Sequence, residues 1–242
     1  MSAHTSFEFF IFTFSMMLFV PLFFWLGIGQ SVRSLKLPET KQKQILTASA
    51  LILFGWFFFS IAIALFGFYH VSQNILSPLV PIAFIVPVAI GATWLQSSKT
   101  LQKILKVFPQ HWLISLQIFR ILGIVFIMLY LQGLLPAFFA IPSGVGDMLV
   151  GGFAPIVAYW YWKKKNNYKQ VVKIWNYLGI IDLLIAIGVG IILAIQVPIG
   201  VSLSTPSTEI MTIFPLVMIP AYAVPLAVVL HLFSLWKLKR EK

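Results

Sequence analysis

The hydrophobic pattern along the chain consists of seven long apolar runs separated by short polar segments. The run from Phe9 to Gly29 is typical, because about 20 apolar residues in a helix are needed to cross a bilayer. The pattern predicts seven transmembrane helices at about 8–29, 45–69, 78–96, 111–132, 143–162, 174–196 and 208–236. The connections are too short to hold a soluble domain, so residues 1–242 are expected to form one all-α integral membrane domain, a seven-helix bundle.

Helix start signals support several of these boundaries. Ser77-Pro78 precedes the third predicted helix and Thr205-Pro206 precedes the seventh. Ser143 follows Pro142, and it is the candidate cap of the fifth helix. The fifth helix is therefore predicted to begin at residue 143.

The basic residues predict the direction of the helices. Sixteen of the seventeen Lys and Arg residues lie between helices 1 and 2, 3 and 4, or 5 and 6, or in the C-terminal tail. The alternate segments 70–77, 133–142 and 197–207 contain none. Because cytoplasmic loops carry such an excess, we expect the N-terminus outside and the C-terminus in the cytoplasm, in the cell (inner) membrane. Seven of the eight tryptophans lie at predicted cytoplasmic helix ends, as interfacial residues do: Trp25, Trp94, Trp112, Trp160, Trp162, Trp175 and Trp236.

Composition agrees with a membrane protein, since 60% of the residues are hydrophobic, 10% are charged and the mean hydropathy is +0.97. The formal charge of +11 would suggest nucleic acid for a soluble protein, but here topology accounts for it and no nucleic-acid partner is expected. The lipid bilayer is the expected partner. The basic loops either attract anionic lipid or only set the topology. The chain has no cysteine, which excludes thiolate metal sites and disulfides.

The last three predicted helices resemble the first three, and the matching helices occur in the same order along the chain. PLVMIPAYAVPLAV, at 215–228, resembles PLVPIAFIVPVAI, at 78–90, and weaker matches relate helix 6 to helix 2 and helix 5 to helix 1. These matches predict a parallel repeat, about 8–96 and about 143–236, joined by a linker helix at 111–132. Parallel repeats occur in secondary transporters. Chance similarity between apolar helices is the alternative.

This 3+1+3 plan resembles the transporter–opsin–receptor superfamily, which includes SWEET-type sugar carriers and microbial rhodopsins. The resemblance covers the whole chain and implies a ligand site between the two repeats. It rests on architecture alone, so no functional residue is carried over. The predicted helix 208–236 lacks the lysine that a retinal Schiff base needs, and the Pro-Gln pair of PQ-loop carriers occurs only at Pro109-Gln110, outside the spans. No cofactor is therefore expected.

Three charged residues fall inside the predicted spans, where ionisable groups are costly and usually mark function. Arg120 and Asp182 each lie roughly 12 Å from the cytoplasmic end, so we expect them to pair. The pair either responds to a substrate or proton, or is a permanent brace between helices. Asp147 is placed nearer the outer surface, roughly 6 Å below it, where a helix dipole would stabilise it.

Other residues are weaker candidates. Gln117, Asn176 and Tyr222 could line a cavity, and Trp56 could stack on a ligand, although interhelical bonding and core packing explain such residues equally well. Prolines inside spans are candidate hinges: Pro21, Pro87, Pro155 and Pro225. No two histidines share a helix at the i, i+4 spacing, so no metal site is predicted.

The first functional hypothesis is a transporter that moves a small polar or anionic solute between the two repeats, near Arg120 and Asp182. A second is an intramembrane lipid-modifying enzyme that uses Asp147 or Asp182. A third is a seven-helix sensor or assembly protein without turnover. The enzyme would need a nucleophile or metal beside the carboxylates, and the sequence offers neither. A receptor would favour a large cytoplasmic segment, and these segments are short.

Overall fold

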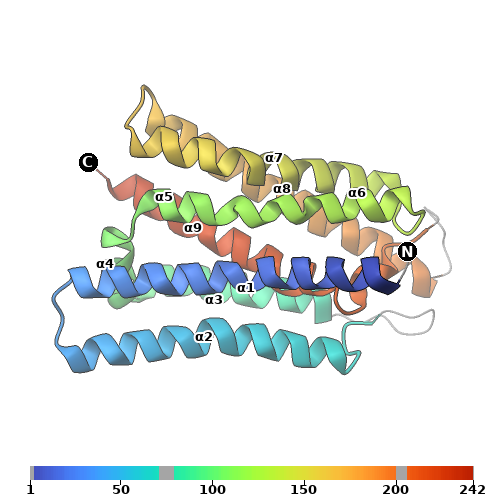
Figure 1. Cartoon of the computed structure of the whole chain (residues 1–242), viewed down its shortest axis with the longest axis horizontal. Coiled ribbons are helices and arrows are strands. Elements are labelled where there is room, and N and C mark those ends of the chain that lie inside the picture. The colour runs from blue at the N-terminus through green and yellow to red at the C-terminus, as the bar shows by residue number, and fades with distance from the viewer. Residues whose placement is uncertain (1–2, 71–78, 200–205, 242) are drawn as a thin grey trace.

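The computed structural model of the chain describes residues 3–70, 79–199 and 206–241, and throughout these ranges the regular structure is helical (Figure 1). The described residues include seven helical spans long and apolar enough to cross a membrane, which confirms the predicted number. The bounds are α1 (Ala3–Ser34), α2 (Glu39–Leu65), α3 (Leu79–Ser97), a composite span Gln110–Leu131, α7 (Ala137–Trp162), α8 (Tyr168–Ile199) and a composite span Ile219–Arg240.

The spans lie side by side along the long axis of the molecule, with α2 at one edge and α7 and α8 at the other (Figure 1). The α1–α2 connection, the α7–α8 turn and the C-terminal end of α9 (Val224–Arg240) all lie at the same end. Among the described residues, all the lysines and arginines except Arg120 lie in segments at this end, which we call the basic end: residues 31–43, 98–110, 160–173 and 236–241. The basic segments that are separate in the sequence are thus gathered at one end of the bundle.

A short amphipathic helix, α4 (Lys99–Val107), lies at the basic end, where the sequence suggested only a connection. The Ser98 hydroxyl caps it by accepting a hydrogen bond from the Leu101 N–H at 3.2 Å. Ile104 and Leu105 are buried, whereas its lysines, Lys99, Lys103 and Lys106, are exposed. Nine residues are too few to cross a bilayer, so hydropathy alone did not mark this helix.

The predicted single helix at 111–132 is wrong in its middle section. The span consists of α5 (Gln110–Ser115), a 3₁₀ helix η1 (Leu116–Gly123) and α6 (Ile124–Leu131). Side chains at i and i+3 share one side of a 3₁₀ helix, so the tighter winding aligns Gln117, Arg120 and Gly123. All three are buried, and they form the side of η1 that meets α7 and α9.

The fifth span begins earlier than predicted. α7 starts at Ala137, directly after Pro136, so Ser143 lies inside the helix and does not cap it. Pro142 falls in the second turn, where its missing N–H removes one hydrogen bond without ending the helix. Asp147 therefore lies ten residues into the span and not about four, which corrects its predicted shallow position.

The last span begins later than predicted, at Ile219 and not at 208. A short 3₁₀ helix η2 (Glu209–Thr212) precedes it, and the span opens as a π-helix, η3 (Ile219–Ala223), before α9. Because Pro220 and Pro225 cannot donate to the i→i−4 ladder, this segment departs from α-helical geometry. Pro225 thus lies in the first turn of α9, while Pro21, Pro87 and Pro155 lie inside α1, α3 and α7.

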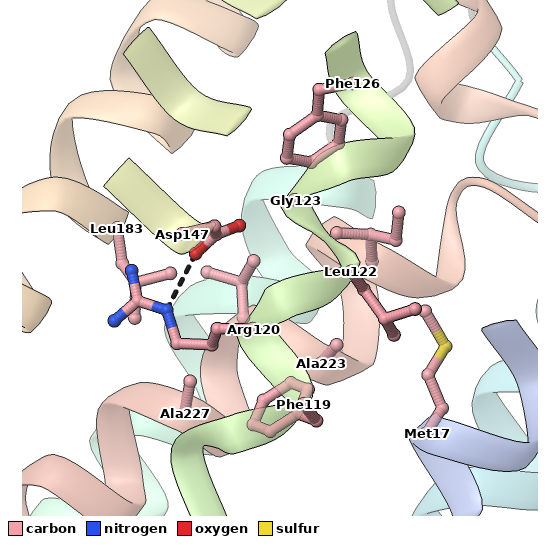
Figure 2. Close-up of a pocket in the computed structure, with 12 residues that line it drawn as sticks. Met17, Phe119, Arg120, Leu122, Gly123, Phe126, Asp147, Leu183, Ala223 and Ala227 are labelled. Carbon is pink, nitrogen blue, oxygen red and sulfur yellow. Dashed lines mark hydrogen bonds and ion pairs between the residues drawn. The ribbon is translucent and has the colours of Figure 1, made fainter. Parts of the chain in front are cut away.

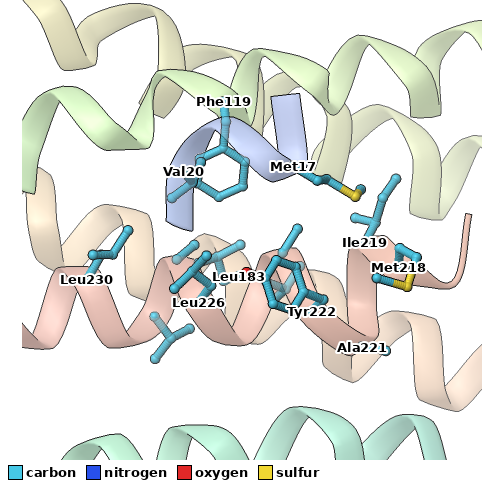
Figure 3. Packing of buried hydrophobic residues seen from close by; sticks show 14 of the residues in the cluster. Met17, Val20, Phe119, Leu183, Met218, Ile219, Ala221, Tyr222, Leu226 and Leu230 are labelled. Atoms are coloured by element: carbon cyan, nitrogen blue, oxygen red, sulfur yellow. The ribbon is translucent and has the colours of Figure 1, made fainter. Parts of the chain in front are cut away.

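The core lies between α1, η1, α8 and the η3–α9 span (Figure 3). Met17 and Val20 of α1 lie near Phe119 of η1 and the buried face of α9. Tyr222 of η3 is fully buried, and the centre of its ring is 4.6 Å from that of Trp56 on α2. Trp56 therefore packs against a protein ring, which agrees with the core-packing alternative for this residue.

Candidate functional site

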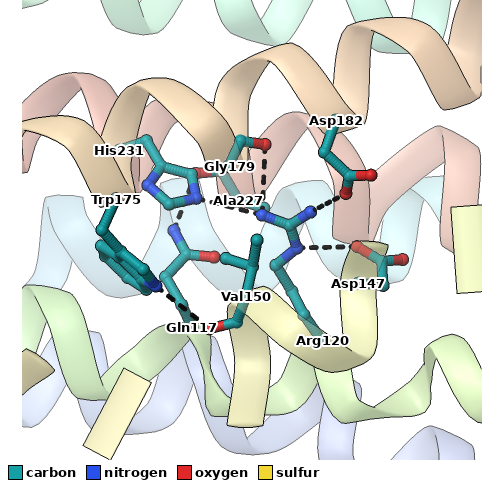
Figure 4. A network of polar contacts seen from close by, with 9 residues as sticks. All are labelled: Gln117, Arg120, Asp147, Val150, Trp175, Gly179, Asp182, Ala227 and His231. Atoms are coloured by element: carbon teal, nitrogen blue, oxygen red, sulfur yellow. Dashed lines mark hydrogen bonds and ion pairs between the residues drawn. The ribbon is translucent and has the colours of Figure 1, made fainter. Parts of the chain in front are cut away.

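Arg120 is the centre of a polar cluster inside the bundle (Figure 4). Its side chain is 1% exposed. The Nε–H donates to the Asp147 Oδ1 of α7 at 2.7 Å, and Nη2 donates to the Asp182 Oδ2 of α8. One guanidinium thus binds two carboxylates from two different helices, and such charge-assisted bonds are about twice as strong as neutral ones.

The second terminal nitrogen of Arg120 binds two further groups. Nη1 donates to the Gly179 carbonyl oxygen at 3.2 Å and lies 3.2 Å from the His231 Nε2 of α9. A guanidinium can only donate, so Nε2 must be the acceptor. The hydrogen of the ring is then on Nδ1, which donates to the Asn176 Oδ1 at 2.9 Å. His231 is therefore neutral in this arrangement. We call Arg120, Asp147, Asp182 and His231 the Arg120 cluster.

A line of hydrogen bonds continues from His231 to the basic end of the bundle. The Asn176 Nδ2 donates to the Ser234 Oγ at 2.9 Å, and the Gln110 Nε2 donates to the same oxygen at 2.7 Å. Asn176 comes from α8, Ser234 from α9 and Gln110 from the start of α5, and all three are buried. These hydrogen bonds hold α5, α8 and α9 together between the cluster and the basic end.

The structure brings together several residues that the sequence singled out. Arg120 and Asp182 form the ion pair that their depths indicated. Asp147, expected near the outer end, joins the same guanidinium because α7 begins six residues earlier than predicted. Gln117 lies one turn before Arg120 and donates to the Ala227 carbonyl oxygen at 3.0 Å.

Two predicted residues lie outside the cluster. Tyr222 and Trp56 pack against each other, and among the described residues the Tyr222 hydroxyl has no hydrogen-bond partner. His231 is a further member of the cluster that was not among the residues singled out from the sequence. The sequence feature that could have identified His231 is its spacing from Ser234, which puts two polar side chains on one face of an otherwise apolar helix.

A small cavity touches the cluster (Figure 2). Its volume is about 20 Å³, enough for about one water molecule. Arg120 and Asp147 form its polar wall, and the rest is apolar: Met17, Phe119, Leu122, Gly123, Phe126, Leu183, Ile219, Ala223, Val224 and Ala227. The cavity beside Arg120 therefore has room for about one water molecule and for no larger solute. The lining includes residues of both irregular segments, η1 and η3.

Two glycines let the helix backbone approach the side chains of the cluster closely. A Cβ built on Gly179 would lie 2.5 Å from the His231 Nε2 and 3.0 Å from the Arg120 Nη1. A Cβ on Gly146 would overlap the carboxylate of Asp182. The polar ends of three side chains therefore rest against bare helix backbone. Gly179 lies three residues before Asp182 on α8, so the same face of this helix carries the small residue and the carboxylate.

Gly179→Ala is expected to lower the free energy of unfolding by about 1–3 kcal/mol, because the new methyl group must displace His231 or Arg120. The control is Gly188→Ala on the same helix, where a Cβ has no described atom within 4 Å. That change should be neutral or stabilise slightly through helix propensity. Thermal unfolding in detergent checks both variants. Equal midpoints for the two would show that Gly179 is not packed against the cluster.

Within the described part of the chain, no group of three His, Asp or Glu side chains comes close enough together to hold a metal ion. The acidic groups of the cluster are bound to Arg120 instead. What the arrangement can do chemically is exchange the acceptors that are bound to one guanidinium.

Comparison with known proteins yields one match. No curated protein matches the chain, and no solved structure matches it. A family model described as a domain of unknown function, DUF8737, matches residues 77–239. The matched segment takes in α3 to α9 and all four residues of the Arg120 cluster, while α1 and α2 precede it. Because the match covers more than half of the sequence, the chain belongs to the DUF8737 family.

Proposed function

We propose that the chain is a multi-pass membrane carrier for a small polar or anionic solute and that the Arg120 cluster is its binding site. The observation that carries the proposal is one buried guanidinium held by two carboxylates. A single carboxylate would suffice to neutralise Arg120 as a brace between helices. The second one makes two anionic groups compete for one cation at a place where charge is costly.

The backbone beside the cluster supports the same proposal. Carriers often place their site where spans are discontinuous, because the broken helices can bend there. The two irregular segments of this chain, η1 and η3, both line the cavity beside Arg120. In the proposed carrier, they are the points at which the spans move. Pro87 and Pro155, inside α3 and α7, are the further candidate hinges on neighbouring spans.

The orientation and the wider architecture form part of the proposal. The basic end faces the cytoplasm, the N-terminus lies outside, and the membrane is the cell (inner) membrane. Anionic lipid headgroups meet the basic end. The two three-helix segments, about 8–96 and about 143–236, act as parallel repeats that move against each other about the linker span.

The absence of cysteine from the chain gives a direct test, because each introduced cysteine is unique. Ala223→Cys and Ala227→Cys place a thiol in the wall of the cavity beside Arg120. Both variants are exposed, in sealed vesicles of each orientation, to a thiol reagent that cannot cross membranes. A carrier opens its site to the two sides in turn, so each cysteine should be labelled from both faces.

Three control positions calibrate the labelling. Lys165→Cys in the α7–α8 turn and Leu134→Cys before α7 should each react from one face only, and opposite faces, which also reads the orientation. Gly55→Cys on the exposed side of α2 should stay unlabelled, since that side is expected to face lipid. Labelling of Ala223→Cys and Ala227→Cys from one face only, or from neither, would contradict the carrier.

A further inference from the structure

We infer that the solute is a small carboxylate anion that binds Arg120 in place of Asp182, and that Asp182 takes up one proton as it leaves. Anion and proton then cross the membrane together. The inference rests on the proposed carrier function and names the substrate class of the same site. It follows from the donors of Arg120, the surroundings of the two carboxylates and the charge of the cluster.

The guanidinium has almost no free donors. Arginine has five N–H groups, and four of them meet acceptors among the described residues: Asp147 Oδ1, Gly179 O, His231 Nε2 and Asp182 Oδ2. One N–H, on the nitrogen that binds Asp182, is left for a further acceptor. An incoming carboxylate that is to form an ion pair with Arg120 therefore needs the Nη2 hydrogen that Asp182 now accepts.

Asp182 is the carboxylate that can leave. Its side chain is 20% exposed, compared with 10% for Asp147. It rests against the bare backbone of Gly146, so no side chain confines it on that side. Asp147 of α7 is packed tightly against η1, because its Cβ lies 2.5 Å from the position that a Cβ on Gly123 would take. The tighter carboxylate stays on Arg120, and the looser one exchanges.

The charges of the cluster require a proton in this exchange. Among the described residues, the ionisable groups grouped with Asp182 around the guanidinium are Arg120 of η1, Asp147 of α7 and His231 of α9, which is neutral. With both carboxylates ionised the cluster has a formal charge of −1. An anion arriving beside an ionised Asp182 would make it −2 in a medium of low dielectric constant.

A proton from water, on the side of the membrane to which the site is open, keeps the formal charge of the cluster at −1. It forms an O–H bond on Asp182 as the ion pair with Nη2 breaks, and the anion accepts the Nη2 hydrogen instead. The formal charge is −1 before and after. Release on the other side reverses both events, so one proton accompanies each anion.

The vacated place has the size of an acetate ion, since the aspartate side chain beyond Cα is that group. Asp182→Ala opens this place, and Arg120 keeps Asp147 as a partner, so the fold should survive. Formate and acetate are the probes, added to purified protein in detergent at constant ionic strength, with gluconate as the bulky balancing anion. Each should raise the unfolding midpoint in a saturable way, on the order of 5 °C when in about 100-fold excess over its Kd.

Two further variants make the result specific. Asp182→Asn keeps the shape of a protonated aspartate and should respond to formate at neutral pH, whereas the unmodified protein should respond only at mildly acidic pH. Asp182→Ala combined with Arg120→Gln should not respond at either pH. No saturable shift in Asp182→Ala and Asp182→Asn, or an equal shift without Arg120, overturns the inference. A response to inorganic phosphate without one to formate or acetate overturns the carboxylate class.

The outcome is separable from that of the carrier proposal, because thiol labelling uses no anion. Labelling from both faces together with no anion response would overturn the substrate class and leave the carrier standing. An anion response without two-sided labelling would show an anion site in a protein that does not alternate.

Discussion

Arg120→Met should destabilise the protein by about 3–5 kcal/mol, the largest loss we expect from one side chain. The change removes the partner of Asp147 and Asp182 and leaves the Gly179 carbonyl oxygen and the His231 Nε2 without their donor. Buried groups that lose a charged partner bear the full cost of their desolvation. Thermal or denaturant unfolding in detergent measures the loss.

The control is a variant that removes the whole set of charges. Arg120→Met combined with Asp147→Asn and Asp182→Asn should recover most of the stability, because no unpaired charge stays buried. Arg240→Met at the end of α9 removes an exposed charge and should change stability by less than about 0.5 kcal/mol. An Arg120→Met loss below about 1 kcal/mol, or a triple variant no better than the single one, would contradict the paired geometry.

Gly151→Ala carries the second large effect, although it adds only a methyl group. A Cβ on Gly151 would lie 2.6 Å from the Ile121 nitrogen and 2.9 Å from the Arg120 carbonyl carbon. These are backbone atoms of η1, which cannot rotate away as a side chain would. The helices must separate, so we expect a loss of about 1–3 kcal/mol, or more if Arg120 loses its contact with Asp147.

The neighbouring residue provides a matched control. Gly152 lies next to Gly151 in α7, and a Cβ there has no described atom within 4 Å. Gly152→Ala should be neutral or should stabilise by up to about 1 kcal/mol through helix propensity. Unfolding midpoints of the two variants provide the comparison. A smaller loss for Gly151→Ala than for Gly152→Ala would rule out the close contact between α7 and η1.

The spans could be predicted from the sequence because a bilayer sets a length that hydropathy can find. The pairing of Arg120 with Asp182 followed from the same count, since both lie about eight residues from the predicted helix ends. Asp147 was misplaced because Pro142 was taken as a helix boundary. The helix passes through that proline, and the error in depth is the number of residues by which α7 starts early.

The rest of the site depends on how spans distant in the sequence are rotated and packed. His231, Asn176 and Gln110 lie on three different spans, and their meeting at Ser234 and Arg120 needs the contacts of α5, α8 and α9. The 3₁₀ winding of η1 was also not predictable, because its residues fit an α-helix equally well. In the structure, α7 packs closely against Gly123 at the end of this segment, a contact that the sequence alone does not show.

A static brace and a carrier site lead to the same loss of stability at Arg120. They differ in motion, because only a carrier must break the contacts among η1, α7, α8 and α9 in each cycle. The unfolding experiments therefore test the geometry of the cluster, and solvent access to the cavity tests its function.

Ala227 is the position where this access is measured most directly, since it is fully buried and lines the cavity beside Arg120. The measurement is the rate at which an impermeant thiol reagent labels Ala227→Cys from each face of sealed vesicles. The carrier predicts labelling from both faces, at rates well above that of Gly55→Cys on the exposed side of α2. Labelling from a single face, or no labelling from either, would contradict it.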